Sequence, residues 1–381
     1  MRTRRLHLAT ALTGVMITGN LVQYALATLG PALIDDLGIS RAAFGMLIGA
    51  YYLMAAALCG PAARLVDRVR AGPGMAGFVA VSTVATAALG FAASYPALLV
   101  CLLIAGAGAA GVNPATNRAV SDVSPPHAML VGTKQSGAQL AALLAGVLLP
   151  PVSLAAGWRT AFMACGLIGA LCLLLLAPLR LPARPRTRSR ATRPLPAGIA
   201  ALTGYSLLMG AGVASVSTYL PLYAHEALGL SAGTAGLSIA IVGCCSAVAR
   251  IGWSLVAERG LWRLSGSTGV LLVIAALSVT AVCVLATAST VGAPMLWVAA
   301  MLLGASATAW NSVVMLAVIR ELPATAVARA SARVQAAFFT GLALSPAVFG
   351  WLVDATGGYL AGWALTGTCF AAAGLVLLSR R

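Results

Sequence analysis

The stretch Leu-Gly-Ile-Ser at 37–40, followed by a glycine at position 45, occurs a second time in this chain. The second copy is Leu-Gly-Leu-Ser at 228–231, again with a glycine five residues after the serine, at position 236. The two copies lie half of the 381-residue sequence apart, so the chain consists of two related halves. Each copy lies between strongly apolar segments. This is the arrangement of a secondary transporter, whose binding site lies between two related halves.

The composition indicates a membrane protein. Apolar residues make up 60% of the chain and charged residues 8%, with a mean hydropathy of +0.96. Soluble domains carry about 25% charged residues, so this chain cannot cover itself with a polar surface and needs lipid as its solvent. The net charge of +16 comes mainly from arginines in short segments between apolar runs, a distribution that sets orientation in a membrane. We therefore expect membrane lipid as a partner and exclude nucleic acid.

Twelve apolar runs are long enough to cross a bilayer as helices, which need about 20 residues. The first run is too long for the apolar part of a signal peptide, so we interpret it as an uncleaved helix. The sequence thus predicts an all-α membrane protein with 12 transmembrane helices in two pseudo-symmetric six-helix halves. The predicted spans are 8–30, 44–64, 73–93, 96–118, 129–152, 158–179, 198–223, 234–256, 265–288, 294–318, 331–352 and 359–378.

The two halves are joined by a basic segment. Residues 180–197 contain six arginines and four prolines. Proline and like-charge repulsion keep such a segment extended. We expect 1–179 to form the N-terminal six-helix half, 180–197 a basic cytoplasmic linker, and 198–381 the C-terminal six-helix half.

The basic residues between spans indicate the orientation. If the N-terminus lies inside, 18 of them fall in cytoplasmic segments and only Arg41 and Arg159 fall outside. An excess of Lys and Arg marks the cytoplasmic side. We expect a multi-pass protein of a bacterial cytoplasmic (inner) membrane with both termini in the cytoplasm.

The segment between the second and third spans carries a recognisable motif. It reads Arg-Leu-Val-Asp-Arg-Val-Arg at 64–70. Over its whole length the chain resembles the major facilitator superfamily (MFS), whose signature at this place is Gly-x-Leu-a-Asp-Arg-x-Gly-Arg. Arg64 and Arg70 depart from that signature, which has glycine at both positions. The resemblance implies a secondary active transporter that works by alternating access.

The same motif implies a gate on the cytoplasmic side. In the family the matching aspartate helps to hold the two halves together when the cavity opens outward, and the resemblance implies this role for Asp67. Glu-Arg at 258–259 repeats the charged part of the motif in the second half. The expected gating residues are Asp67, Arg68, Arg118, Glu258 and Arg259.

Two further segments resemble different branches of this family. Residues 132–137, preceded by 113–118, resemble members that move small anions. Gly137, Gly146 and Pro151 match part of the antiporter pattern of the fifth span. Two functions therefore remain open: transport of a small organic or inorganic solute, which we expect to be an anion, and proton-coupled export of a drug or metabolite.

All eight side-chain amides fall in spans one, four, five, ten and eleven. An amide that faces lipid has no partner, so these spans must face protein or water, and because they come from both halves they surround one cavity. The alternative is that the amides bond neighbouring helices together. With Tyr24, which shares a helix face with two of them, the expected cavity-lining residues are Asn20, Gln23, Tyr24, Asn113, Asn117, Gln135, Gln139, Asn311 and Gln335.

Four basic residues lie within spans, whereas no carboxylate lies deep in any of them; they are Arg118, Lys134, Arg250 and Arg333. A buried cation without a partner is costly. We therefore expect an anionic solute to contact Lys134, Arg250 and Arg333. All four lie in the cytoplasmic half, so the alternative is that their side chains snorkel to the cytoplasm. Arg118 could instead pair with Asp67.

The sequence lacks the combinations typical of catalytic and metal sites. It has no Gly-x-Ser-x-Gly and no His-Glu-x-x-His, and its eight cysteines form no Cys-x-x-Cys pair. We expect a transporter rather than an intramembrane enzyme, without cofactor or metal, and a receptor built on a transporter fold is the third alternative. The expected partners are lipid and a small solute, with a coupling proton left open, and we expect a monomer.

The orientation can be tested by cysteine labelling. A membrane-impermeant maleimide should label Arg41→Cys or Arg159→Cys in intact cells, because both positions are expected outside. Arg188→Cys, in the linker, should be labelled only after the membrane is opened. Labelling of position 188 in intact cells would reverse the orientation.

Overall fold

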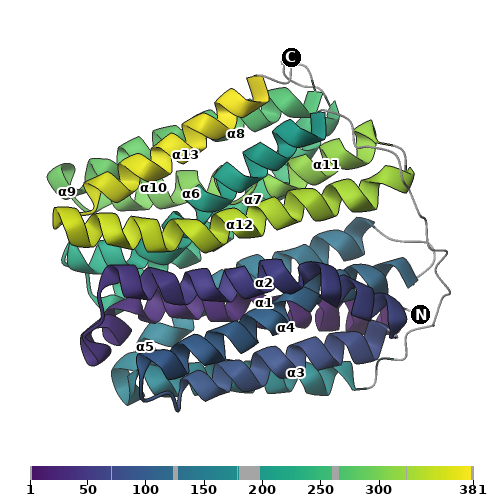
Figure 1. Ribbon diagram of the computed structural model, residues 1–381, viewed down its shortest axis with the longest axis horizontal. Coiled ribbons are helices and arrows are strands. Elements are labelled where there is room, and N and C mark those ends of the chain that lie inside the picture. Colours follow the sequence, from purple (N-terminus) through teal and green to yellow (C-terminus); the bar gives the residue numbers. More distant parts are fainter. Residues whose placement is uncertain are drawn as a thin grey trace. The chain divides into compact units, whose positions relative to one another are not determined.

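The computed structural model describes residues 2–69, 71–122, 128–177, 179, 198–259, 266–322 and 324–378. The expected linker, 180–197, lies outside the described residues. Every regular element in the described part of the chain is a helix (Figure 1). The prediction of an all-α protein is confirmed.

The chain forms two compact units, which are described separately. Unit 1 consists of Met1–Gly38 and Ala50–Thr187. The short segment Ile39–Gly49 belongs to unit 2, so the second helix is divided between the units. The helices of unit 1 are α1 (Arg2–Leu37), α2 (Arg41–Arg68, from Ala50 onward), α3 (Ala71–Leu89), α4 (Tyr95–Asp122) and α5 (Ala128–Leu176).

Unit 2 consists of Ile39–Gly49 and Arg188–Arg381. It contains the first residues of α2 and all the remaining elements. These are α6 (Gly198–Glu226), α7 (Ala232–Arg259), α8 (Gly266–Ala286), α9 (Ala288–Val291), α10 (Pro294–Ala305), α11 (Asn311–Glu321), α12 (Ala324–Thr356) and α13 (Leu360–Leu378).

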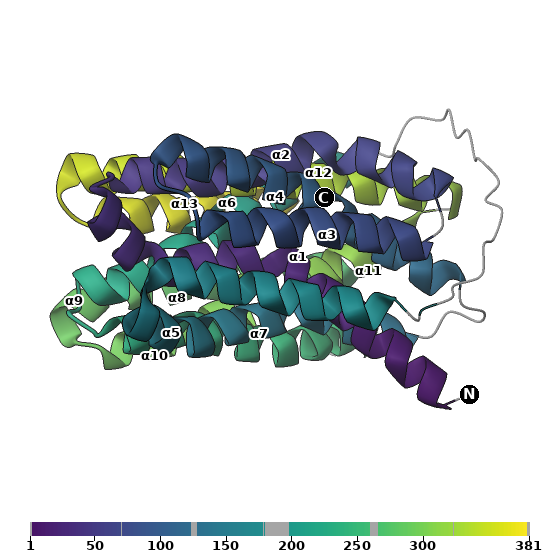
Figure 2. The same cartoon turned by 90° about the horizontal axis from the view of Figure 1, so that it is seen from below.

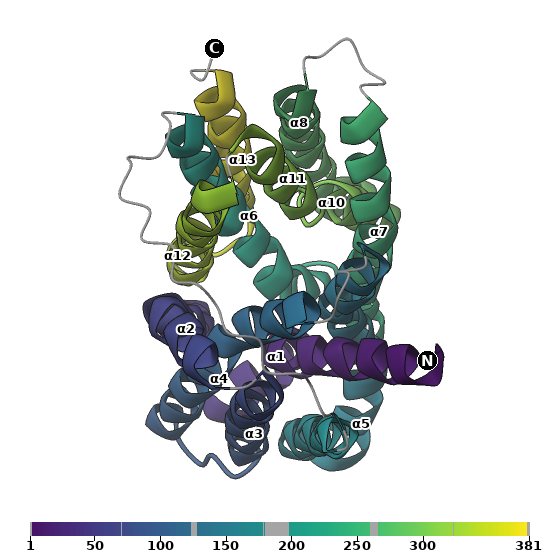
Figure 3. The same cartoon turned by 90° about the vertical axis from the view of Figure 1, so that its right-hand side faces the viewer.

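Helix pairing within unit 2 repeats that within unit 1. In unit 1, α1 packs on α5, and α3 packs on α4 and on α5 (Figure 2). In unit 2, α6 packs on α12 in the same way, and α8 packs on α10 and on α13 (Figure 3). The first span of each half thus contacts the fifth, and the third contacts the fourth and sixth. The two halves share one fold, as the sequence repeat predicts.

The repeated Leu-Gly-x-Ser stretch forms the same turn in both halves. Gly38 (φ 59°) and Gly229 (φ 66°) have positive φ angles, which end the preceding helix and are favourable only for glycine. Ser40 and Ser231 then cap the next helix, because each hydroxyl accepts a hydrogen bond from the amide three residues later, at 3.1 and 3.2 Å.

Ten helices of the described chain are long and apolar enough to cross a membrane. One of them, Thr133–Leu176, contains the fifth and sixth expected spans, joined without a loop at Gly157, where φ is 83° and ψ is 160°. The expected tenth span, 294–318, is not one helix. It is divided into α10 and α11 by turns at 306–310.

Candidate functional site

Lys134 is the single lysine of the chain, and its side chain is fully buried in unit 1. Its ammonium donates hydrogen bonds to Thr116 Oγ1, at 2.9 Å, and to Asn117 Oδ1, at 2.6 Å. Both acceptors are neutral and lie on α4. Within the described residues, no carboxylate bonds this ammonium. In the part of the chain that the structure describes, this lysine is therefore bonded by uncharged oxygens.

Small residues bring three helices close together around Lys134. Gly137 of α5 lies against α1, where an added Cβ would be 2.5 Å from the carbonyl oxygen of Thr13. Gly19 of α1 lies against α4, where an added Cβ would be 2.6 Å from a methyl group of Val112. Such close approach excludes water from the space between the helices, which explains why the lysine side chain is buried.

The amides of α1 bond within their own helix. Asn20 donates to the carbonyl oxygen of Met16 at 2.8 Å, and Gln23 donates to Asn20 Oδ1 at 3.3 Å. The alternative in which amides bond neighbouring helices together requires bonds between helices. These two bonds lie within α1 and do not connect it to another helix. Both side chains are half-buried.

The remaining candidates of unit 1 differ in exposure. Gln139 is buried and Asn117 is exposed. Tyr24, Asn113 and Gln135 are half-buried. Among all these residues, the structure brings together Lys134 with Asn117, and Asn20 with Gln23.

The candidates of unit 2 lie on three helices. The guanidinium of Arg250, on α7, donates to the carbonyl oxygen of Thr308 at 2.9 Å. Asn311 is the first residue of α11 and is half-buried. On α12, Gln335 is half-buried whereas Arg333 is exposed.

The expected cytoplasmic gate is only partly described. The side chains of Asp67, Glu258 and Arg259 lie outside the described residues. Arg68 is exposed, and Arg118 is buried with 7% exposure. The pairing of Asp67 with Arg118 stays a prediction.

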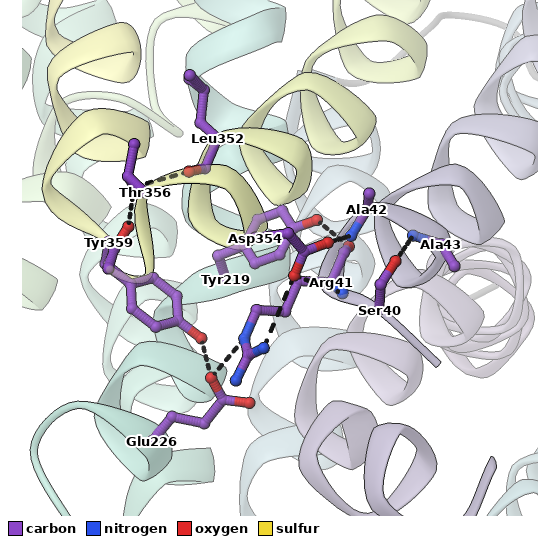
Figure 4. Close-up of polar contacts among 11 residues, drawn as sticks. Ser40, Arg41, Ala42, Ala43, Tyr219, Glu226, Leu352, Asp354, Thr356 and Tyr359 are labelled. Carbon is purple, nitrogen blue, oxygen red and sulfur yellow. Dashed lines mark hydrogen bonds and ion pairs between the residues drawn. The ribbon is translucent and has the colours of Figure 1, made fainter. Parts of the chain in front are cut away.

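A second polar cluster, which we call the outer cluster, consists of Arg41, Glu226, Asp354 and Tyr359 of unit 2 (Figure 4). Arg41 Nε donates to Glu226 Oε2 at 2.9 Å, and Arg41 Nη1 lies 3.7 Å from Asp354 Oδ1. The Tyr359 hydroxyl donates to the same Glu226 oxygen at 2.6 Å. Arg41 therefore joins the start of α2 to the end of α6, through Glu226, and to α12, through Asp354.

Asp354 also binds the first turn of α2. Its two carboxylate oxygens accept hydrogen bonds from the backbone amides of Arg41, at 3.2 Å, and Ala42, at 2.8 Å. A carboxylate at a helix N-terminus satisfies amides that lack a partner and is favoured by the helix dipole. The segment 39–49 is thereby attached to α12 through both its side chain and its backbone.

Close backbone packing extends this attachment. Gly45 faces the carbonyl oxygen of Pro346 and the Tyr219 hydroxyl so closely that a Cβ at this position would collide with both. The Tyr219 hydroxyl lies 2.8 Å from the carbonyl oxygen of Arg41 and 2.7 Å from that of Pro346. The first two turns of α2 therefore fit tightly on unit 2.

Burial, together with the hydrogen bond to Glu226, raises the pKa of the Tyr359 hydroxyl above its ordinary value. Tyr359 therefore stays protonated at neutral pH and remains a donor. A cavity of about 680 Å³ lies beside the cluster and is lined by residues including Arg41, Glu226 and Trp363.

Sequence reasoning missed the outer cluster as a site. The clue was a departure from the repeat: Arg41 follows the first Leu-Gly-x-Ser stretch, whereas Ala232 follows the second. Charge at one of two otherwise matching positions indicates a role that belongs to one half only. Thr116 gave no such clue, because hydroxyl residues occur throughout the spans.

Comparison with known proteins supports the fold. A family model described as Major Facilitator Superfamily matches residues 11–292. No curated protein sequence matches the chain at a significant level.

Two solved structures are similar over almost the whole chain. A bacterial homolog of the human lysosomal transporter Spinster, inward-facing and occupied, has a TM-score of 0.83 and 16% identity, covering 99% of this chain and 96% of that chain. The nucleoside transporter NupG has a TM-score of 0.79 and 14% identity, covering 98% of this chain and 99% of that chain. At these identities the likeness shows the fold.

The outer cluster gives a stability prediction. Arg41→Gln should lower the free energy of unfolding by about 1 kcal/mol, the upper end for partly exposed ion pairs, because Glu226 and Asp354 both lose a charged donor. Arg159→Gln is the matched control, since Arg159 pairs with Asp36 at 2.9 Å but both side chains are more than 40% exposed. Thermal unfolding in detergent measures both variants. Equal melting temperatures for the two would show that the cluster adds nothing beyond a surface pair.

Proposed function

The chain belongs to the major facilitator superfamily, and on that premise we propose that it moves a small organic or inorganic anion across the membrane by alternating access. Its fold and its many apolar helices make it a multi-pass membrane transporter. The observation that supports an anion is the environment of Lys134. The fully buried ammonium is bonded to Thr116 and Asn117, and no carboxylate of the described part of the chain is paired with it.

Physical chemistry favours an anion at this position. Burying an isolated charge costs several kcal/mol, and a nearby opposite charge offsets much of that cost. Attraction between unit charges also grows as water is removed. An anionic solute that reaches Lys134 would therefore be stabilised, whereas a cationic solute would be repelled.

The bond to Asn117 is the one that a solute can replace. Asn117 is exposed although its Oδ1 holds the ammonium at 2.6 Å. Its amide can turn away from the ammonium without disturbing α4. A carboxylate or other oxyanion would then take its place and exchange a neutral acceptor for a charged one, which forms a stronger hydrogen bond.

The remaining candidates complete the proposed pathway. Unit 1 contributes neutral groups that orient a solute, and unit 2 contributes amides and further positive charge. The proposed lining is Asn20, Gln23, Tyr24, Asn113, Asn117, Lys134, Gln135, Gln139, Arg250, Asn311, Arg333 and Gln335.

Two gates control access in this proposal. The outer cluster opens when Arg41 leaves Glu226 and Asp354, which releases segment 39–49 from the rest of unit 2. Asp67, Arg68, Arg118, Glu258 and Arg259 form the cytoplasmic gate. The protein works as a monomer in the inner membrane with both termini in the cytoplasm, and 180–197 connects the halves 1–179 and 198–381.

The single lysine makes the proposal directly testable. Protein labelled with ¹⁵N-lysine carries one labelled side-chain nitrogen, so its Nζ signal reports on Lys134 alone. A panel of anionic, neutral and cationic metabolites is first screened by thermal shift, since a bound ligand stabilises the folded state. We expect the stabilising compounds to be anions and to shift the Nζ signal.

Substitution at Lys134 provides the control. Lys134→Gln should weaken binding of such an anion by roughly 1.5–3 kcal/mol, or about ten- to a hundredfold in Kd, because a charge-assisted bond is lost. Lys134→Arg keeps the charge and should weaken binding less. If a cationic compound is bound and driven outward by a proton gradient, the protein is an exporter of the other type. If Lys134→Gln binds anions normally, Lys134 does not hold the anion. Either outcome overturns the proposal.

A further inference from the structure

The tenth span is broken near its middle. Helix α10 ends at Ala305 and α11 begins at Asn311. Between them, the amide of Thr308 donates to the carbonyl oxygen of Leu303 at 3.2 Å, and the amide of Ala309 donates to that of Ser306 at 3.0 Å. In a continuous helix the Ala309 amide would donate to Ala305 instead. At the break, the carbonyl oxygen of Ala305 therefore loses its usual donor, the Ala309 amide.

Side chains of α7 replace the missing partners. Trp253 Nε1 donates to the carbonyl oxygen of Ala305 at 2.6 Å. Arg250 Nη2 donates to the carbonyl oxygen of Thr308 at 2.9 Å, and Ser246 Oγ donates to the same oxygen at 3.3 Å. Positions 246, 250 and 253 lie on one face of a helix, so a single face of α7 serves the whole break.

Close packing holds this face in place. An added Cβ at Gly304, just before the break, would lie 2.6 Å from the carbonyl oxygen of Val242 and 2.8 Å from Cys245 Cβ. Helix α7 therefore touches the backbone of α10 one turn before Ser246 reaches the break. The donors are aligned with the carbonyls by this contact.

The local sequence explains part of the break. Positions 295–321 contain no proline, but the hydroxyls of Ser306 and Thr308 donate back to the carbonyl oxygens of Leu302 and Gly304, at 2.7 and 3.1 Å, and such bonds bend helices. The opposite case occurs in unit 1, where α4 contains Pro114 but remains one helix from Tyr95 to Asp122. These local bonds do not supply donors to the carbonyl oxygens of Ala305 and Thr308, which are bonded by side chains outside the tenth span.

We propose that Arg250, with Trp253 and Ser246, is a positioning residue that keeps the tenth span open at 306–310. Irregular backbone at membrane depth persists only where other groups satisfy it, and these three side chains do so. The break leaves α11 free to turn relative to α10, and its first residue is Asn311. Buried Trp310 anchors that end of the helix against Tyr205 and Phe338, at ring distances of 5.6 and 5.3 Å.

This inference changes the expected role of Arg250. The sequence predicts that its charge contacts a solute. The geometry directs the guanidinium to a backbone carbonyl, so that within the proposed lining Arg250 acts through the placement of Trp310 and Asn311, and Arg333 remains the cation of unit 2 that is expected to contact a solute. The inference concerns the transporter's conformation and holds whether or not the solute is an anion.

Hydrogen exchange in lipid nanodiscs, without any solute, tests the proposal. Arg250→Met and Trp253→Phe each remove a donor, after which the cheapest partner for the freed carbonyl is the backbone amide one turn later. The break then closes toward a continuous helix. We expect peptides covering 304–314 to exchange at least tenfold more slowly in both variants, and peptides covering α8 to remain unchanged.

The controls separate positioning from other roles. Arg250→Lys keeps a charged donor and should retain wild-type exchange, and Trp351→Phe changes a tryptophan that is 60% exposed on α12 and should have no effect. Ser246→Ala removes the longest of the three hydrogen bonds and should slow exchange at 304–314 by a smaller factor. This milder variant keeps the test available if Arg250→Met and Trp253→Phe do not fold. Unchanged or faster exchange at 304–314 in Arg250→Met and Trp253→Phe would overturn the proposal, because the break would then not depend on α7.

Discussion

The structure depends on one constraint: a polar group in the hydrocarbon of a membrane must find its partner inside the protein. This constraint makes every regular element of the described chain a helix. It also explains the two places where helices alone are insufficient. At the break in the tenth span, the carbonyl oxygens of Ala305 and Thr308 are bonded by side chains of α7. The ammonium of Lys134 is bonded by oxygens of α4. Both exceptions bring polar chemistry to the interior of a unit.

The fold could be predicted from the sequence because its signals are local and occur twice. The Leu-Gly-x-Ser stretches at 37–40 and 228–231 form turns in which glycine takes a positive φ and serine caps the next helix. The break in the tenth span could not be predicted, since the side chains that bond its carbonyls lie more than fifty residues earlier, on α7. Pro114 would have suggested a break in the fourth span, yet α4 is continuous from Tyr95 to Asp122. Local signals therefore predict the elements, whereas contacts between helices decide where they are interrupted.

The candidate site was predictable to a lesser degree. A lone lysine within an apolar span indicates a functional group whatever its partners are, and the structure buries it completely. Its partner Thr116 could not be chosen from the sequence, because α4 and α5 are placed through α1, by close contacts of Gly19 with α4 and of Gly137 with α1. Arg41 was recognised only as a charge outside the spans. Its bonds to Glu226 and Asp354 join residues more than 180 positions apart, and no spacing rule connects them.

Two kinds of positive charge emerge from this comparison. Arg41 and Arg250 have their acceptors in the protein itself, where they hold a helix start and a helix break. Among the described residues, Lys134 has two neutral acceptors, one of which is exposed. The proposed anion therefore binds at Lys134 and not at Arg41 or Arg250.

The central claim is tested most directly by solid-supported membrane electrophysiology on proteoliposomes, with concentration jumps of anionic, neutral and cationic solutes at equal pH on both sides. We expect charge displacement with anions in the wild type and its loss in Lys134→Gln. Signals from cationic or neutral solutes alone, or anion signals that persist in Lys134→Gln, would contradict it.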